Sequence, residues 1–341
     1  MRIHKIDLLR AIGLFMIVAA HLSPPALLHQ LRNFDVPLMV LVSGASLQLS
    51  HRNRGSYLNY IWKRIKRLVA PVWLFLTLWF LLFYLVNPSH PYLDAGNLEA
   101  SYLLSDRVQY LWIIRVFLLV ALIAPFLYRI NHRIRSHTRF FALLLAGIVG
   151  YHLLRYNQFE AAWGGVFTAF TESALYYLLP YGLVYLLGMR LVQLPGPALR
   201  RVWYFFAGTF LLLAMALALW TGALVPTQSY KYPVAYYYLS YAMMVSVALW
   251  IWGDRVWALM GPSLQRMIFF VSNHSIWIYL WHIPAVRCTV YADLSFFTAY
   301  PLTLMLAIAM TWLQVRVINR FLLPRFSDRS ALQNIRLILL G

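Results

Sequence analysis

Long apolar runs, broken at short intervals by basic clusters and turn-forming residues, dominate this 341-residue chain. A bilayer core about 30 Å thick needs roughly 20 apolar residues for each helix that crosses it. The pattern predicts about ten membrane-spanning helices, of which the second and fifth are short. They lie at residues 7–28, 34–50, 68–86, 108–128, 140–154, 173–190, 202–222, 233–253, 267–284 and 298–319. We therefore predict an all-α, polytopic integral membrane bundle. It forms a single transmembrane domain over 1–341, in which 320–341 is a short basic cytoplasmic tail.

The distribution of basic residues orients these helices. Of 29 lysines and arginines, 22 fall in segments that face the cytoplasm if the N-terminus is inside. Five fall in the opposite segments: Arg32, Arg107, Arg155, Lys231 and Arg287. Cytoplasmic loops of membrane proteins carry such an excess of positive charge. The alternation predicts that both termini are cytoplasmic.

Composition narrows the class of protein further. Hydrophobic residues make up 62% of the chain and charged residues 11%, which excludes a cytosolic globular enzyme and a disordered chain. Cys288 is the one cysteine, so an intramolecular disulfide and a cysteine-cluster zinc site are excluded, and we predict no metal. The net charge of +19 is distributed between apolar runs, so it indicates membrane topology, and we predict no nucleic-acid partner.

Two basic residues interrupt the first apolar run, Arg10 and His21. They are 11 positions apart, which at ~100° per residue is within ~20° of a whole number of turns and gives a rise of ~16 Å. A basic side chain inside a membrane helix is costly and therefore suggests a function. The spacing predicts a polar face with an anion anchor at the cytoplasmic end and an imidazole near the outer end. Two simpler interpretations remain open: Arg10 as a topology anchor, and His21 as an interfacial histidine bonded to a neighbouring helix.

Further motifs accompany this pair in a fixed order. The pair and these motifs together resemble the membrane acyltransferase-3 family, the bacterial O-acyltransferases. The segments that carry the resemblance are Lys5–Gly13, Asp35–Gly44, Arg64-x2-Arg67-x3-Pro71, Leu111–Arg115 and Ser275–Pro284. The second segment departs from the family pattern, because Met39-Val40-Leu41 stand where aromatic residues are usual. The similarity runs from residue 5 to about 285.

The resemblance implies an integral membrane O-acyltransferase, multi-pass in the bacterial inner (plasma) membrane. Such an enzyme moves an acetyl or other acyl group from cytoplasmic acyl-CoA, most often acetyl-CoA, to a hydroxyl. The acceptor would be a cell-surface polysaccharide or a lipid-linked glycan, and membrane lipid would be a further partner. The sequence leaves open the acceptor sugar, the acyl length, the side of the membrane where the acceptor is modified, and whether the protein forms a homo-oligomer.

Within this resemblance, His21 is either the general base or a nucleophile that carries the acyl group, and we favour the base. Arg10 would bind a CoA phosphate or balance charge in the channel. Arg64 and Arg67 would bind CoA phosphates from the inner face, where arginine can bind phosphate through two hydrogen bonds. Arg115 would contact an oxyanion or a phosphate, or it is a basic residue that reaches to the membrane surface.

Other candidates would assist from nearby. Asp35 would orient His21 or cap the second helix. Tyr279 and His282, in the ninth helix, would face the acceptor or assist His21, although a hydrogen-bonded packing histidine fits equally well. The tyrosine-dense segment Tyr230–Tyr238 is either an interfacial aromatic belt or a platform for sugar rings.

A different class of protein also fits part of the pattern. A transporter or flippase for a sugar-containing or anionic substrate would share the ten helices, the buried basic residues and the proline-broken segments. Two features count against it: the sequence has no detectable pair of repeats, and a transporter leaves the ordered motifs unexplained.

Overall fold

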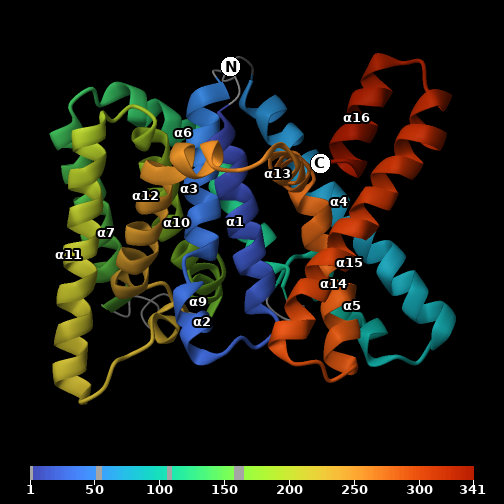
Figure 1. Cartoon of the computed structure of the whole chain (residues 1–341), viewed down its shortest axis with the longest axis horizontal. Helices are drawn as coiled ribbons and strands as arrows, with labels where there is room; N and C mark the ends of the chain where they lie inside the picture. Colours follow the sequence, from blue (N-terminus) through green and yellow to red (C-terminus); the bar gives the residue numbers. More distant parts are fainter. Residues whose placement is uncertain (1–2, 51–55, 106–109, 157–164) are drawn as a thin grey trace. The chain divides into compact units, whose positions relative to one another are not determined.

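A computed structural model describes residues 3–50, 56–105, 110–156 and 165–341 (Figure 1). Within these ranges the regular elements are helices and no strand occurs, so the all-α prediction is confirmed for this part of the chain. Four of the basic residues used for orientation lie outside the described residues, as does the start of the predicted span 108–128. They are Arg2, Arg52, Arg54 and Arg107.

The chain divides into two compact units, residues 1–54 with 122–268 and residues 55–121 with 269–341. Two of the three boundaries fall inside helices, α6 (Trp112–Arg133) and α13 (Pro262–Asn273). The first unit also holds α1 (His4–Ala20), α2 (Ala26–Leu31), α3 (Asp35–Ser50), α7 (His137–Tyr156), α9 (Gly165–Phe170), η2 (Thr171–Leu175), α10 (Tyr176–Leu191), α11 (Gly196–Thr221), η3 (Thr227–Tyr230) and α12 (Tyr236–Ala258). The second unit holds α4 (Tyr57–Val86), η1 (Pro91–Leu93), α5 (Ala95–Tyr102), α14 (Ser275–Tyr291), α15 (Phe296–Val317), η4 (Ile318–Leu322), η5 (Leu323–Arg325) and α16 (Arg329–Leu339).

Helix α3 forms the core of the first unit. It packs against α1, α10 and α12, and Leu38, Leu41 and Val42 on it are fully buried. Helix α11 is the opposite case: it runs beside α12 (Figure 1) and buries only Val202 and Phe206. An apolar helix that buries so little against protein is suited to contact lipid.

Helices α3 and α10 approach so closely that their backbones touch. A methyl group at Gly44 of α3 would collide with the carbonyl of Tyr185, and one at Gly188 of α10 would collide with the carbonyl of Leu41. Small residues permit this kind of contact between membrane helices, because no side chain separates the two backbones. Two glycines on facing helices therefore fix the central packing of the first unit.

In the second unit, α14 packs against α15 and α4. The segment predicted to be a basic tail, 320–341, contains α16, which Asp328 caps through the backbone N–H groups of Ser330 and Ala331. Helix α16 also packs against α4, where Lys66 donates a hydrogen bond of 3.0 Å to Asn334. The tail thus contributes a docked helix to this unit.

Six helices of the described residues are long and apolar enough to cross a membrane: Tyr57–Val86, Trp112–Arg133, His137–Tyr156, Thr171–Leu191, Gly196–Thr221 and Phe296–Arg325. Each of the ten predicted ranges contains helix, but α1 has 17 residues and α3 has 16. At 1.5 Å per residue these two helices are about 25 Å long, which is less than the thickness of the hydrocarbon core. The number of ten spans and the orientation of the termini stay predictions.

Two of the predicted ranges are divided in the structure. The first helix ends at Ala20 instead of continuing to 28, because Ser23 has a φ of 50° and Pro24 and Pro25 follow it. Proline cannot continue the backbone hydrogen bonds and disfavours helix in the residue before it. The range 267–284 comprises parts of α13 and α14, which meet at His274.

The contact between α3 and α10 leads to a stability prediction. Gly188→Ala should destabilise the protein by about 1–3 kcal/mol, because the added methyl group forces two backbones apart. Gly208→Ala is the matched control: that glycine lies in α11 with open space where an alanine methyl group would project, and alanine favours helix. Thermal unfolding of the two purified variants in detergent provides the comparison. Equal melting temperatures would contradict the close packing.

Candidate functional site

Arg10 lies on α1 with its side chain 24% exposed, held from two directions. Its guanidinium is 3.9 Å from the carboxylate of Asp7, one turn earlier on the same helix. It also donates a hydrogen bond of 3.1 Å to the hydroxyl of Ser46 on α3. Asp7 is itself buried, so the pair places opposite charges in an apolar setting. Neither partner was predicted from the sequence, although the i,i+3 spacing of Asp7 and Arg10 is a recognisable signal.

His21 forms the C-cap of α1 and is half-buried. The prediction placed it inside a helix that continues to residue 28, and this was wrong, since Ala20 is the last helical position. The backbone N–H of His21 still donates to the carbonyl of Val18, so the residue continues the helical path. Arg10 is the seventh of the 17 residues of α1, and His21 follows its last residue.

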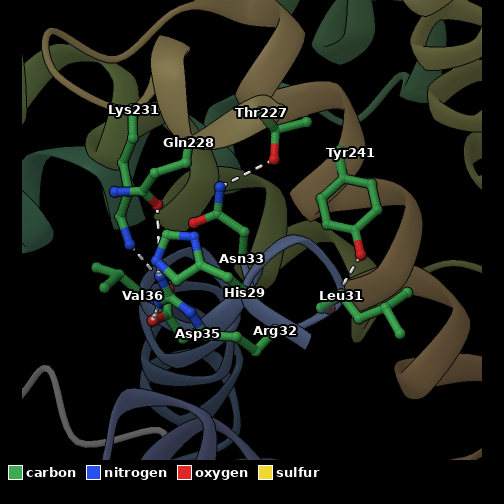
Figure 2. Close-up of polar contacts among 10 residues, drawn as sticks. All are labelled: His29, Leu31, Arg32, Asn33, Asp35, Val36, Thr227, Gln228, Lys231 and Tyr241. Carbon is green, nitrogen blue, oxygen red and sulfur yellow. Dashed lines mark hydrogen bonds and ion pairs between the residues drawn. The ribbon is translucent and has the colours of Figure 1, made fainter. Parts of the chain in front are cut away.

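Asp35 begins α3 and is the centre of a buried ion cluster (Figure 2). Its carboxylate is 2.6 Å from Arg32 and 3.3 Å from Lys231, and it accepts a hydrogen bond of 2.8 Å from the N–H of Val36. The three charged residues are between 1% and 4% exposed. We refer to Arg32, Asp35, Lys231 and the adjacent His29 as the Asp35 cluster.

The charge count interpreted Arg32 and Lys231 only as loop charges, and their pairing with Asp35 was not predicted.

His29 lies at one edge of this cluster, and its contact with Arg32 defines which ring nitrogen carries the proton. Arg32 lies 2.9 Å from Nε2 of His29 (Figure 2), and since arginine can only donate, this nitrogen accepts and the proton is on Nδ1. Burial lowers the pKa of His29, and the charges of Arg32 and Lys231 lower it further. His29 thus remains neutral beside two cations.

Neutral hydrogen bonds extend the cluster to the segment before α12. The side chain of Asn33 donates to the hydroxyl of Thr227 at 2.9 Å (Figure 2), and the N–H of Thr227 donates to Gln30 at 2.9 Å. The hydroxyl of Tyr241 donates to the carbonyl of Leu31 at 2.9 Å. The connection between α1 and α3 is therefore tied to η3 and α12.

The role predicted for Asp35 in orienting His21 stays a prediction. The carboxylate of Asp35 contacts Arg32, Lys231 and the backbone of Val36, and these contacts define its position without reference to the imidazole.

The tyrosine-dense segment next to this cluster is partly core. Tyr237 and Tyr238 are buried at 7% and 0% exposure, whereas Tyr232 is 46% exposed. The hydroxyl of Tyr237 donates to the carbonyl of Val225. At least two of the tyrosines therefore pack inside the first unit instead of presenting a surface to a sugar.

The two predicted CoA-binding arginines lie in the second unit, one turn apart on α4. Arg64 is half-buried with its guanidinium 5.0 Å from the centre of the Tyr60 ring, and Arg67 is exposed. Among the described residues neither forms an ion pair with a carboxylate. The two cations therefore retain charge that a phosphate can neutralise.

The other three candidates also lie in the second unit. Arg115 is half-buried on α6. On α14, the hydroxyl of Tyr279 donates to the carbonyl of Tyr110, and Nδ1 of the fully buried His282 donates to the carbonyl of Tyr279. The structure thus brings Tyr279 and His282 together. It places Arg10, His21 and Asp35 in one unit and the remaining candidates in the other.

Among the described residues, no group of three or more histidine, cysteine, aspartate or glutamate side chains could hold a metal ion.

Comparison with known proteins identifies the class. The family model Acyl_transf_3, described as an acyltransferase domain, matches residues 3–316. The chain therefore belongs to the membrane acyltransferase-3 family and is a membrane acyltransferase, which confirms the resemblance seen in its motifs. No curated protein and no solved structure matches the chain.

The charge balance of the Asp35 cluster leads to a second stability prediction. Asp35→Asn removes the carboxylate that Arg32 and Lys231 both contact, and breaking a buried pair in this way costs about 3–5 kcal/mol. Lys231→Met should cost less, because Arg32 and Asp35 remain balanced one to one. Thermal unfolding in detergent measures both variants. A larger loss for Lys231→Met than for Asp35→Asn would contradict this account of the cluster.

Proposed function

We propose that this membrane acyltransferase moves an acetyl or other acyl group from cytoplasmic acyl-CoA to a hydroxyl of a cell-surface polysaccharide or lipid-linked glycan. One observation carries the proposal: a single helix holds a partly buried arginine, fixed by Asp7 and Ser46, and ends in a half-buried imidazole. A binding group and a proton-transfer group ~16 Å apart suit a donor that enters from one face and an acceptor that meets it near the other.

In the proposed reaction, the His21 imidazole takes the proton of the acceptor hydroxyl. At the same time the hydroxyl oxygen attacks the carbonyl carbon of the thioester. The carbon–sulfur bond breaks, the acyl group becomes an ester of the acceptor, and the proton goes to the departing CoA thiolate. A histidine imidazole suits this transfer, because a ring nitrogen can accept a proton and later donate it. In the alternative course, His21 first carries the acyl group and then releases it to the hydroxyl.

Charge supports the choice of donor. Coenzyme A carries several phosphate charges, and Arg64 and Arg67 are two adjacent cations on α4 without carboxylate partners in the described chain. We propose that they bind these phosphates from the cytoplasmic side, with Arg115 of the same unit as a further contact. The proposal includes a topology of ten membrane spans with both termini in the cytoplasm, and a location in the bacterial inner membrane.

The role of His21 has a direct test. His21→Ala should lower acyl transfer by about 10²–10⁴-fold, because the reaction loses its proton acceptor or its acyl carrier. The measurement uses purified full-length protein in detergent, radiolabelled acetyl-CoA and the membrane glycan fraction of the cells that make the protein. His137→Ala, at an exposed histidine that begins α7, is the matched control and should retain transfer. Full transfer by a folded His21→Ala variant would remove His21 from the chemistry.

The donor site has a separate test. Arg64→Ala and Arg67→Ala should each raise the KM for acetyl-CoA by about tenfold or more with a smaller effect on kcat, because a phosphate contact contributes to binding of the ground state. Lys63→Ala removes an exposed charge from the same turn of α4 and is the control. An unchanged donor KM in both arginine variants would exclude this pair from the CoA site.

A further inference from the structure

The second unit contains a pocket of about 120 Å³ that the predicted site residues do not occupy. Helix α4 supplies aromatic walls, with the rings of Phe75 and Trp79 stacked at 6.0 Å, and Phe80 beside them. The polar lining includes Tyr92 of η1, Asn97 of α5 and Arg287 of α14. Pockets for drug-sized ligands occupy roughly 300–1,000 Å³, so this one suits a single ring.

Arg287 is held at the pocket by one aromatic residue. It donates a hydrogen bond of 2.5 Å from Nη1 to the hydroxyl of Tyr92, and its guanidinium lies 4.6 Å from the centre of the same ring. Its Nε is buried and has no hydrogen-bond partner among the described residues. Arg287 also has no ion pair with a carboxylate within them. A guanidinium is a planar fork that can bind a carboxylate or a phosphate, so the charge of Arg287 favours an anion.

The remaining polar groups suit hydroxyls. Because the Tyr92 oxygen accepts from Arg287, its own proton is available to a ligand. The amide nitrogen of Asn97 donates one hydrogen bond to the carbonyl of Pro91, which leaves its second N–H and its oxygen. The flat faces of aromatic side chains can pack against the apolar C–H faces of a saturated ligand ring, while such donors and acceptors bind the hydroxyls of that ligand.

We propose that this pocket binds an anionic sugar residue of the acceptor glycan, with Arg287 on its carboxylate or phosphate and the α4 aromatic residues against its ring. The inference rests on the proposed function. The charge distribution supports it, because η1, α5 and Arg287 belong to segments predicted to face outward, away from the CoA side. A CoA site would need several cations, and among the described residues that line the pocket Arg287 is the one basic residue.

The test is saturation-transfer NMR on the purified full-length protein in detergent with three probes: D-glucuronate, glucose 1-phosphate and D-glucose. At least one anionic probe should bind more tightly than glucose. Arg287→Gln should weaken that binding by about tenfold to a hundredfold, the loss expected for a charge-assisted hydrogen bond. Arg287→Lys keeps the charge without the fork and should weaken it less. Arg266→Gln, at an exposed arginine of α13, is the control and should bind as the wild type does.

Three results would overturn the inference: equal binding of all three probes, no binding of either anionic probe, or full binding by a folded Arg287→Gln variant. The measurement needs neither an acyl donor nor transfer. If sugar binding fails while His21-dependent transfer persists, only this inference fails. If Arg287-dependent binding holds while transfer from acetyl-CoA is absent, the proposed function fails and the pocket remains.

Discussion

A charge buried in an apolar chain needs an opposite charge or hydrogen bonds, and in the Asp35 cluster three buried charged residues meet this constraint together. The chain has 10 acidic residues against 29 lysines and arginines, so a buried carboxylate is a scarce partner. Asp35 contacts both Arg32 and Lys231, which come from segments almost 200 residues apart. The attraction therefore joins the connection between α1 and α3 to the segment that leads into α12. Helix α2, within that connection, buries no residue, so apolar burial contributes little to holding it in place.

Helix α3 links this cluster to the proposed chemistry. Its first residue is Asp35, and Ser46, three turns later, contacts Arg10 of α1. Gly44 and Gly188 hold the same helix against α10 at backbone contact. One rigid element thus supports the two polar centres of the first unit, and the position of Arg10 depends on it. For a reaction that needs a fixed distance between a binding group and a proton acceptor, such rigidity is a direct advantage.

The sequence predicted where helices lie, but it did not predict the partners of the buried charges or the residues of the pocket, for identifiable reasons. Apolar periodicity located helix in all ten predicted ranges, because side-chain burial and backbone hydrogen bonding in a bilayer both favour it. It overestimated the first helix, since the left-handed backbone at Ser23 ends the helix earlier than Pro24 and Pro25 would require. Arg32 and Lys231 were interpreted as topology charges, because a positive-inside count records where a charge lies along the chain and nothing of its partner. The Arg287 pocket was not foreseen, since its walls come from α4, η1, α5 and α14.

The sequence by itself determined the all-helical architecture and the family, because the first follows from local spacing along each segment and the second from motifs in a fixed order. Only the tertiary structure decided which charges pair, which tyrosines are buried and which aromatic residues enclose a pocket. Those facts depend on contacts between segments far apart in the chain. Their energies arise from distance and burial in space, which residue order does not specify.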